Sequence, residues 1–300
     1  MAGDGTGRAT ERDGEGGREH RPAPGLHFVS VPIGNARDIT LRALDVLRGA
    51  DVLAAEDTRS LRRLMEIHGI ALAGRRIHAY HDANGPRARP GLLAALGEGK
   101  SVAYASEAGT PLVADPGYAL ARDAAAAGHD VTCAPGASAL TAALAVAAMP
   151  SDRVLFAGFP PPGRGERRRW IEGLDAAGAT AVLYESPRRV RDLLGELGEV
   201  LGGERPAAMC RELTKRFEEV RRGTLASLAE GLDADPRGEV VLLVGRPGKE
   251  GSDPDAAEAM LREAMARLTL KDAVREVTEE SGMKRRDVYA MALRLAEDRR

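Results

Sequence analysis

The chain has 300 residues, of which 43% are apolar and 29% charged, and its formal net charge at pH 7 is −2. This composition is typical of about two folded domains, and it excludes binding of nucleic acid or anionic membrane through bulk positive charge. Aromatic residues, at 3%, are too few for a single-strand stacking platform, and the two distant cysteines favour neither a disulfide framework nor a zinc site, so we expect a soluble, cytoplasmic protein.

The first residues of the chain differ in composition from the rest. Residues 1–25 alternate glycine with charged residues and contain no apolar block that would serve as a signal sequence or a membrane anchor. We therefore expect this segment to be a disordered tail. No uninterrupted apolar stretch of the chain approaches the roughly 20 residues of a membrane-spanning helix, so no membrane partner is expected.

Strand and helix patterns alternate over residues 26–149, which we expect to form a first domain. Short apolar runs alternate with amphipathic segments, several of which end at glycine. This alternation predicts a parallel sheet covered by helices. The expected strands are residues 26–31, 51–55, 76–80, 101–105 and 130–133, and the expected helices are residues 38–48, 58–68, 117–127 and 137–148.

Three loops rich in glycine, proline and small residues follow expected strands of this domain. They are residues 32–35, 106–111 and 135–138, and residues 115–118 continue the second loop. The carboxyl ends of parallel strands meet at one edge of a sheet, where open α/β sheets bind ligands. Because glycine lets a ligand approach the backbone closely, we expect one small ligand to contact these loops. Each loop taken alone is also explained as a tight strand-to-helix turn, with Ser138 as a helix cap.

Polar side chains also follow the third expected strand. His81, Asp82 and Asn84 lie in the loop after residues 76–80, where contact with a substrate or a cofactor is the favoured interpretation. A metal site would need a further convergent ligand. We therefore expect no metal.

A second α/β domain is expected over residues 150–247. Its expected strands are residues 154–159, 180–184, 207–210, 218–223 and 239–245. Residues 218–223 are typical of an exposed antiparallel strand, so this sheet is expected to be mixed. The loop 159–163, with three consecutive prolines before Arg164, is interpreted as a mobile lid.

The last segment, residues 256–300, is predicted to be helical. Residues 270–281, a glycine turn and the basic start of residues 284–295 follow the pattern of a helix-turn-helix. Such a unit would dock on structured RNA. A small bundle that supports a dimer explains it equally well, because acidic and basic residues nearly cancel.

Five short motifs occur in a fixed order along the chain. From about Leu26 to the end, the chain resembles the ribosomal RNA small subunit methyltransferase I family of the tetrapyrrole methylase superfamily. The motifs are Pro32-Ile33-Gly34-Asn35, Ala55-Glu56-Asp57-Thr58-Arg59, Gly109-Thr110-Pro111, Tyr184-Glu185-Ser186 and Arg211-Glu212-Leu213-Thr214-Lys215.

The resemblance implies a homodimeric enzyme of two α/β domains that are not of the Rossmann type. It implies methyl transfer from S-adenosylmethionine to the ribose 2′-hydroxyl of a cytidine in the decoding region of 16S rRNA, in the small ribosomal subunit. This chain has Glu107 where the family usually has aspartate, and Ala83 where the family has a second histidine. The expected cofactor-binding residues are Pro32, Gly34, Asn35, Ser106, Glu107, Ala108, Gly109, Thr110, Pro135, Ser138, Tyr184 and Glu185.

The acceptor in such a reaction is a weakly nucleophilic hydroxyl, so a base or a nearby cation should help. Lys215 and Glu185 are the candidates, with Arg211 beside Lys215. A lysine acts as a base only if burial or neighbouring cations such as Arg211 and Arg216 lower its pKa. Otherwise Lys215 clamps phosphate or forms a charge pair with Glu212, and Glu185 serves as a carboxylate at a helix start.

Arginine clusters interrupt the otherwise balanced charge. If the clusters lie on one face of the protein, they would form a basic surface that binds RNA, because the guanidinium binds phosphate bidentately. Each cluster alone is also explained as a solubilising helix face. The expected substrate-binding residues are Asp57, Arg59, His81, Asn84, Arg164, Arg168, Arg188, Lys284 and Arg285.

Two other functions stay open. The first is a methylase of a tetrapyrrole-type small molecule, for which the arginine clusters and the helical segment would be superfluous. The second is a regulator without enzymatic activity, in which the α/β domains sense a ligand and the last helices bind nucleic acid.

Overall fold

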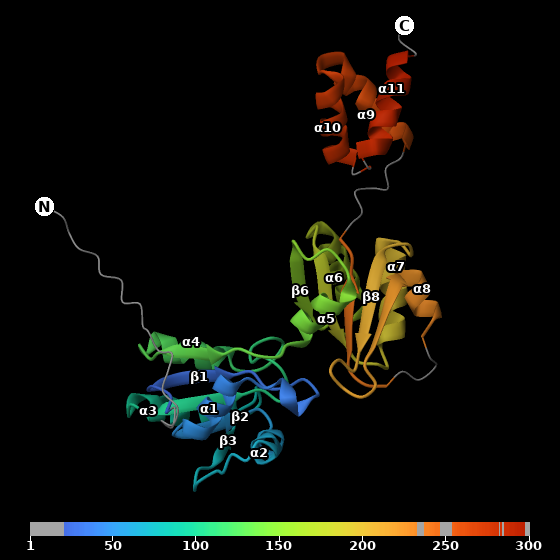
Figure 1. Cartoon of the computed structure of the whole chain (residues 1–300). Coiled ribbons are helices and arrows are strands. Elements are labelled where there is room, and N and C mark those ends of the chain that lie inside the picture. Colours follow the sequence, from blue (N-terminus) through green and yellow to red (C-terminus); the bar gives the residue numbers. More distant parts are fainter. Residues whose placement is uncertain (1–20, 233–236, 247–253, 282, 284, 298–300) are drawn as a thin grey trace, which may run out of the picture. The chain divides into compact units, whose positions relative to one another are not determined.

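The computed structural model in Figure 1 describes residues 21–232, 237–246, 254–281, 283 and 285–297. The chain divides into two compact units, Met1–Ser138 and Ala139–Arg300. Most of the predicted tail, and Lys284, lie outside the described residues. Within the last part of that predicted tail, Arg21 pairs with Asp51 and Gly25 begins the first strand. No helix of the described part of the chain is long and apolar enough to cross a membrane.

The first unit contains one parallel sheet, as predicted. Its strand order is β3-β2-β4-β1-β5, and every neighbouring pair is parallel. The strands are β1 (Gly25–Val29), β2 (Val52–Ala55), β3 (Ile77–Ala79), β4 (Ser101–Ala105) and β5 (Val131–Ala134). The helices are the short 3-10 helix η1 (Ala36–Asp38), α1 (Leu41–Gly49), α2 (Thr58–Ile67), α3 (Gly85–Gly97) and α4 (Tyr118–Ala126).

The three central strands of this sheet, β2, β4 and β1, are buried on both faces, which explains their apolar sequences. Alternate residues point to opposite faces, so Val102 and Tyr104 pack with α3 and α4 whereas Ala103 and Ala105 pack with α1 and α2. Burying each large apolar side chain contributes about 1.5–3 kcal/mol. The sheet is therefore a rigid support for the loops at its ends.

One predicted helix begins later than expected, and one helix was not predicted. The expected helix 38–48 begins at Leu41, because residues 36–38 form η1 and the Thr40 hydroxyl caps α1 by accepting from Ala43 N. Helix α3 has no predicted counterpart. Its sequence contains Pro86 and Pro90, and proline in a helix interior ordinarily argues against a helix.

Strands β4 and β1 form the point where the chain changes direction across the sheet. The helix after β1 packs on one face, and the helix after β4 packs on the other. In open α/β sheets, such neighbours leave a crevice at their carboxyl ends.

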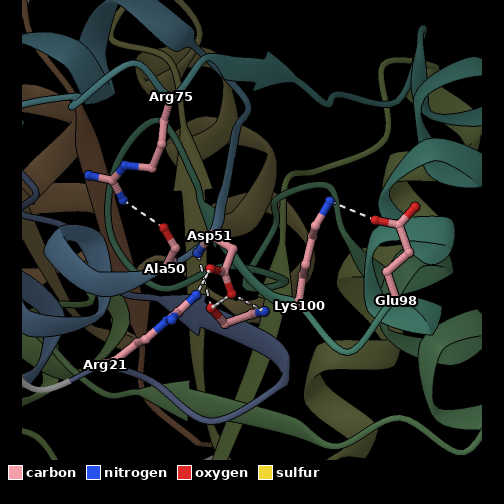
Figure 2. Close-up of polar contacts among 7 residues, drawn as sticks. Arg21, Ala50, Asp51, Arg75, Glu98 and Lys100 are labelled. Carbon is pink, nitrogen blue, oxygen red and sulfur yellow. Dashed lines mark hydrogen bonds and ion pairs between the residues drawn. The ribbon is translucent and has the colours of Figure 1, made fainter.

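The amino ends of β2 and β4 are joined by a polar network (Figure 2). The Asp51 carboxylate accepts hydrogen bonds from Ser101 N at 2.9 Å and Ser101 Oγ at 2.8 Å, and it pairs with Arg21. These donors lower the pKa of Asp51 to about 2. Arg75 donates to the carbonyl oxygen of Ala50 at 2.7 Å, and Lys100 pairs with Glu98.

The second unit contains a mixed sheet, also as predicted. Its order is β6-β7-β10-β8-β9; β6 and β7 are parallel, and the other neighbours are antiparallel. The strands are β6 (Val154–Gly158), β7 (Thr180–Glu185), β8 (Pro206–Arg211), β9 (Glu219–Thr224) and β10 (Val240–Val244). The helices beside it are α5 (Ala139–Ala147), α6 (Arg164–Ala176), α7 (Val190–Leu201) and α8 (Leu225–Glu230).

Helices α6, α7 and α8 share one apolar core with the second sheet, and α5 contacts β8, β9 and β10. The predicted domain boundary follows Met149, whereas the contacts divide the chain after Ser138, so α5 goes with the second unit. Near the C-terminus, α9 (Pro254–Arg267), α10 (Leu270–Ser281) and α11 (Arg285–Glu297) enclose a core of their own. The α/β fold with a helical C-terminal segment is thus confirmed.

Candidate functional site

A cavity of about 670 Å³ lies at the carboxyl edge of the first sheet. The loops after β1, β2 and β4 all contribute to its wall. Five of the expected cofactor-binding residues and two of the expected substrate-binding residues line it, namely Pro32, Gly34, Ser106, Glu107 and Ala108 with Asp57 and Arg59. Val31, Ile33, Leu61, Leu64 and Ile67 make the other parts of the wall apolar.

The loops after β1 and β4 are bonded to each other by their backbones. Val31 N donates to Gly109 O at 2.8 Å, and Gly109 N donates to Val31 O at 3.1 Å. Gly109 has φ +74°, and a Cβ atom there would lie 3.3 Å from Ile33 Cγ2. This close approach in a left-handed conformation is the reason for glycine at this position.

Hydroxyl groups connect the loop after β5 to the same cluster. Thr110 Oγ1 donates to Ala137 O at 3.0 Å and lies 3.0 Å from Ser30 Oγ, while Thr40 Oγ1 donates to Pro135 O at 3.2 Å. Gly109, Thr110 and Pro135 therefore support the cavity from behind its lining. Asn35 caps η1 by accepting from Arg37 N at 3.1 Å.

Carboxylates gather where β2 and β4 end. Glu56 Oε2 accepts from Glu107 N at 3.1 Å. Burial, then the charge of Glu56 and finally that of Glu107, raise the pKa of Asp115 to about 7, although a hydrogen bond with Ser106 offsets part of this effect. This edge therefore attracts a cation. Neither Glu56 nor Asp115 is among the site residues predicted from the sequence, although Glu56 belongs to the second of the five motifs and Asp115 to the segment 115–118.

Asp57 and Arg59 stand at the start of α2. The Asp57 carboxylate accepts from Arg59 N at 2.8 Å and Ser60 N at 3.4 Å, which lowers its pKa and caps the helix. The Arg59 side chain is 92% exposed. Asp57 thus shapes the wall, and Arg59 is available to an external partner.

His81 and Asn84 lie in the turn between β3 and α3. Asn84 Oδ1 accepts from His81 N at 2.8 Å, and Asn84 Nδ2 donates to Ala79 O at 3.0 Å. The Asn84 side chain therefore holds this turn. His81 lines a second, smaller cavity of the first unit.

The expected catalytic residues meet at one edge of the second sheet. Glu185 at the end of β7 and Arg211 at the end of β8 both pair with Val240 of the strand between them. Glu185 is 5% exposed and accepts from Ser186 N at 2.6 Å and Arg189 Nε at 2.8 Å. Arg211 pairs with Glu219 at 2.7 Å.

Lys215 lies between two carboxylates. Its Nζ atom is 2.9 Å from Glu212 Oε1 and 3.0 Å from Glu239 Oε2. Burial alone would lower the pKa of Lys215, but the two carboxylates outweigh burial and raise the pKa. The condition under which Lys215 would act as a base, a lowered pKa, is therefore not met, and Lys215 stays a cation. The predicted charge pair with Glu212 is present.

The loop that carries Lys215 has an unusual backbone. Glu212 and Thr214 have φ values of +50° and +65°, which cost residues other than glycine conformational energy. Gly238 permits this arrangement, because a Cβ atom there would lie 2.4 Å from Glu212 Cγ. Strain of this kind gathers at functional sites.

Tyr184 belongs to an aromatic cluster on the second sheet. Its ring lies 5.0 Å from that of Phe156 and 5.7 Å from that of Phe159, both edge to face. Arg167 donates to Pro161 O at 3.1 Å and Pro162 O at 3.0 Å, and it also pairs with Glu196. The loop 159–163, interpreted from sequence as a mobile lid, is thus fastened to α6 and α7.

The remaining expected substrate-binding arginines are spread over the surface. Arg164 and Arg168 line a cavity of about 300 Å³ together with Glu196 and Glu199, so its charges are mixed. Arg188 is exposed after β7, and Arg285 is exposed at the start of α11.

Comparisons with known proteins agree in their result. The profile of the tetrapyrrole (corrin/porphyrin) methylases matches residues 25–229, and that of the RsmI C-terminal HTH domain matches residues 250–296. The chain is 46% identical over 274 residues to the ribosomal RNA small subunit methyltransferase I of Mesorhizobium japonicum, covering 91% of this chain and 92% of that protein. It is 40% identical to the protein of the same name from Pseudomonas aeruginosa, covering 89% and 96%.

Solved structures share the fold at low sequence identity. A diphthine synthase matches with a TM-score of 0.59 and 19% identity, covering 73% of this chain and 89% of that one. A cobalt precorrin-4 methyltransferase matches with a TM-score of 0.56 and 19% identity, covering 73% and 94%. These likenesses concern the α/β fold alone.

Proposed function

The chain belongs to the ribosomal RNA small subunit methyltransferase I family, and we propose that it methylates the ribose 2′-hydroxyl of a cytidine in the decoding region of 16S rRNA, with S-adenosylmethionine as donor. The resemblance found in the sequence is confirmed by these relatives. We propose further that the enzyme acts in the cytoplasm, as a homodimer, on the small ribosomal subunit.

The observation that carries the donor assignment is the cavity of about 670 Å³ at the carboxyl edge of the first sheet. Its volume lies within the range of about 300–1,000 Å³ that is usual for small-molecule sites. Its apolar residues suit an adenosine, and its backbone loops and carboxylates suit the charged amino-acid part and the sulfonium. The residues proposed to hold the donor are Pro32, Gly34, Ser106, Glu107 and Ala108, together with the neighbouring Asn35, Gly109, Thr110, Pro135 and Ser138.

S-adenosylmethionine, when bound, supplies a methyl group that a positively charged sulfur activates for displacement. The protein's contribution to such a reaction is to orient donor and acceptor and to exclude water. The hydrogen bonds that connect Val31 to Gly109 and Thr110 to Ala137 hold the loops of the cavity in place, which fits that role.

The second unit supplies the proposed catalytic groups. Lys215, held as a cation by Glu212 and Glu239, stabilises negative charge that develops on the acceptor oxygen or on a neighbouring phosphate. Glu185 is the proposed proton acceptor, and Arg211 positions the strand end through Glu219. The proposed RNA contacts are Asp57, Arg59, His81, Asn84, Arg164, Arg168, Arg188, Lys284 and Arg285.

The test is transfer of labelled methyl groups to small ribosomal subunits, followed by mapping of the modified nucleotide. Ala108 is exposed and lines the cavity, so Ala108→Trp fills the cavity without disturbing the core. We expect at least a 100-fold loss of donor affinity by calorimetry, and loss of transfer. Ala125→Trp, on the exposed surface of α4, is the matched control and should behave as the wild type.

Two results would overturn this proposal. Wild-type protein that transfers no label to small subunits, but does transfer it to a tetrapyrrole, would place the chain with the small-molecule methylases. Unchanged donor affinity in Ala108→Trp would show that the donor binds elsewhere.

A further inference from the structure

A second cavity, of about 320 Å³, lies in the first unit on the side of α3 and α4. The turn after β3, the first part of α3 and the loop before α4 form its wall. Neither the family's profile nor the names of its relatives assign a role to it. The lining residues with polar groups that matter here are Tyr80, His81, Asp82, Arg89, Asp115 and Tyr118.

The wall of this cavity is held in place by buried contacts. The Tyr104 hydroxyl lies 3.4 Å from Tyr80 O and 3.3 Å from Pro116 O, so it connects two sides of the wall. The Tyr80 and Tyr104 rings pack edge to face at 5.6 Å. In the loop between β4 and α4, Leu112 and Ala114 adopt φ values of +72° and +60°. Backbone strain of this kind persists only where the surroundings enforce it.

The Tyr80 side chain contributes a hydroxyl group to the wall of this cavity. Tyr80 is 3% exposed as a residue and lines the cavity, and its hydroxyl is not among the fully buried polar atoms of the described residues that lack a partner. That hydroxyl lies beside Gly85, which also lines the cavity. A phenolic hydroxyl on the wall of a cavity can donate a hydrogen bond to a ligand or accept one from it.

The charges around the cavity exclude phosphate as that ligand. Asp82 and Asp115 line the wall, and Glu56 and Glu107 act on Asp115 from the carboxyl ends of β2 and β4. The one arginine of the lining, Arg89, pairs with Asp123 at 2.9 Å. An acidic wall repels a polyanion and accepts hydrogen bonds from N–H groups.

We propose that this cavity receives the base of the target nucleotide and that it selects cytosine, with the Asp115 carboxylate accepting from the exocyclic amino group and the Tyr80 hydroxyl donating to a ring acceptor. Enzymes that act on one nucleotide commonly extrude it and hydrogen-bond its Watson–Crick edge. Cytosine offers an amino donor beside a ring-nitrogen acceptor. Uracil carries a carbonyl oxygen and an N–H in these places. Its carbonyl oxygen would therefore face the Asp115 carboxylate, and both of these groups are hydrogen-bond acceptors.

The volumes of the two cavities fit the assignment of the methyl donor to the larger cavity and of the target base to the smaller one. The larger one, about 670 Å³, suits a donor made of an adenosine and an amino acid, whereas about 320 Å³ is at the lower end of small-ligand sites. The inference rests on the proposed cytidine methylation. It adds the residues that choose the base.

The test compares small subunits that carry cytidine or uridine at the methylated position, at pH 8 and with saturating S-adenosylmethionine. For the wild type we expect kcat/KM for cytidine to exceed that for uridine by about 10-fold or more. Asp115→Asn should narrow the preference to less than about 3-fold, because an amide N–H can donate to the uracil carbonyl. Tyr80→Phe keeps the ring packing and should raise KM for the cytidine subunit by about 10-fold.

Asp45→Asn is the matched control, since Asp45 is an exposed acid of α1 that pairs with Arg48. It should keep the wild-type preference. Donor affinity is measured by calorimetry in every variant, and Asp115→Asn should bind the donor within about 2-fold of the wild type. Weakened donor binding in Asp115→Asn with an unchanged base preference would place the donor's adenine in this cavity, and the proposal would be wrong.

The proposed function and this inference fail in different ways. A wild type that does not methylate the cytidine subunit contradicts the proposed function. A wild type that methylates it, while Asp115→Asn and Tyr80→Phe both keep the full cytidine preference and KM, contradicts the assignment of this cavity alone.

Discussion

Strands β2 and β4 carry carboxylates and a serine at both of their ends, in opposite electrostatic settings. At the amino ends, Asp51 accepts hydrogen bonds from Ser101 and pairs with Arg21, and its pKa falls to about 2. At the carboxyl ends, burial and the charges of Glu56 and Glu107 raise the pKa of Asp115 to about 7. The carboxylate at the amino edge is stabilised in its charged form within the protein, whereas the charged form of Asp115 at the carboxyl edge is destabilised.

The largest expected difference between the two edges concerns a matched pair of glycines. Gly109 at the carboxyl edge has φ +74°, and Gly99 before β4 has φ +73°. Alanine at either position should cost about 1–2 kcal/mol of unfolding free energy, because the backbone strain is the same. Only Gly109→Ala should reduce kcat/KM for methyl transfer, on the order of 10-fold or more, because its Cβ atom would meet Ile33 at 3.3 Å and shift a loop of the donor cavity.

Urea unfolding and methyl-transfer assays on both glycine variants check this prediction. Equal losses of activity in Gly99→Ala and Gly109→Ala would remove the functional distinction between the two edges.

Replacement of Asp51 should affect stability without affecting activity. The folded-state pKa of Asp51, about 2, lies below the ordinary value of 3.8, so its contribution to stability is present above pH 4 and is lost as the pH falls toward 2. The side chain is 23% exposed, and after solvent screening we expect Asp51→Asn to lose about 1–2 kcal/mol at pH 7. Urea titrations at pH 7 and pH 3 should show the gap to the wild type shrinking at the lower pH. A gap that grows with acidity would contradict the lowered pKa.

Replacement of Asp115 should have the opposite effect on the free energy of unfolding. Its folded-state pKa is raised, so the folded protein binds more protons than the unfolded chain, and stability falls as the pH rises from about 4 to 7. Asp115→Asn removes this penalty and should gain on the order of 1 kcal/mol at pH 8, with little change at pH 4. Thermal unfolding at both pH values measures the effect. Destabilisation at pH 8 would mean that Asp115 is satisfied within the protein.

The smallest expected effect concerns Arg21 at the amino edge. Its side chain is 73% exposed, and exposed ion pairs contribute about 0–1 kcal/mol. Arg21→Gln should therefore cost less than about 0.5 kcal/mol at low salt and nothing measurable at 1 M salt. A larger or salt-independent loss would show that Arg21, rather than Ser101, satisfies Asp51.

The fold could be predicted wherever the local pattern agrees with the tertiary environment. Strand Ser101–Ala105 and helix Leu270–Ser281 have the bounds that their apolar periodicity predicts. Helix α3 was missed because Pro86 and Pro90 argue against a helix locally, although its buried Leu92 and Leu96 pack against the sheet. Packing therefore outweighs local propensity in this segment.

The loops that form the candidate site could be predicted from the sequence, but the electrostatic environment of its residues could not. Glycine and proline identified the loops after β1 and β4, and these line one cavity. The raised pKa of Lys215 depends on Glu239, which is 24 residues away, and the cavity that Tyr80 lines is formed by three separate segments. Such effects arise only when distant residues meet, and no local pattern records them.

Hydrogen exchange along the first unit, with and without saturating S-adenosylmethionine, tests the central claim most directly. Donor binding at the carboxyl edge should slow amide exchange in residues 31–36 and 106–110 and leave residues 47–52 and 98–101 unchanged. Slowed exchange at the amino edge, or unchanged exchange at the carboxyl edge when calorimetry shows saturation, would contradict the account.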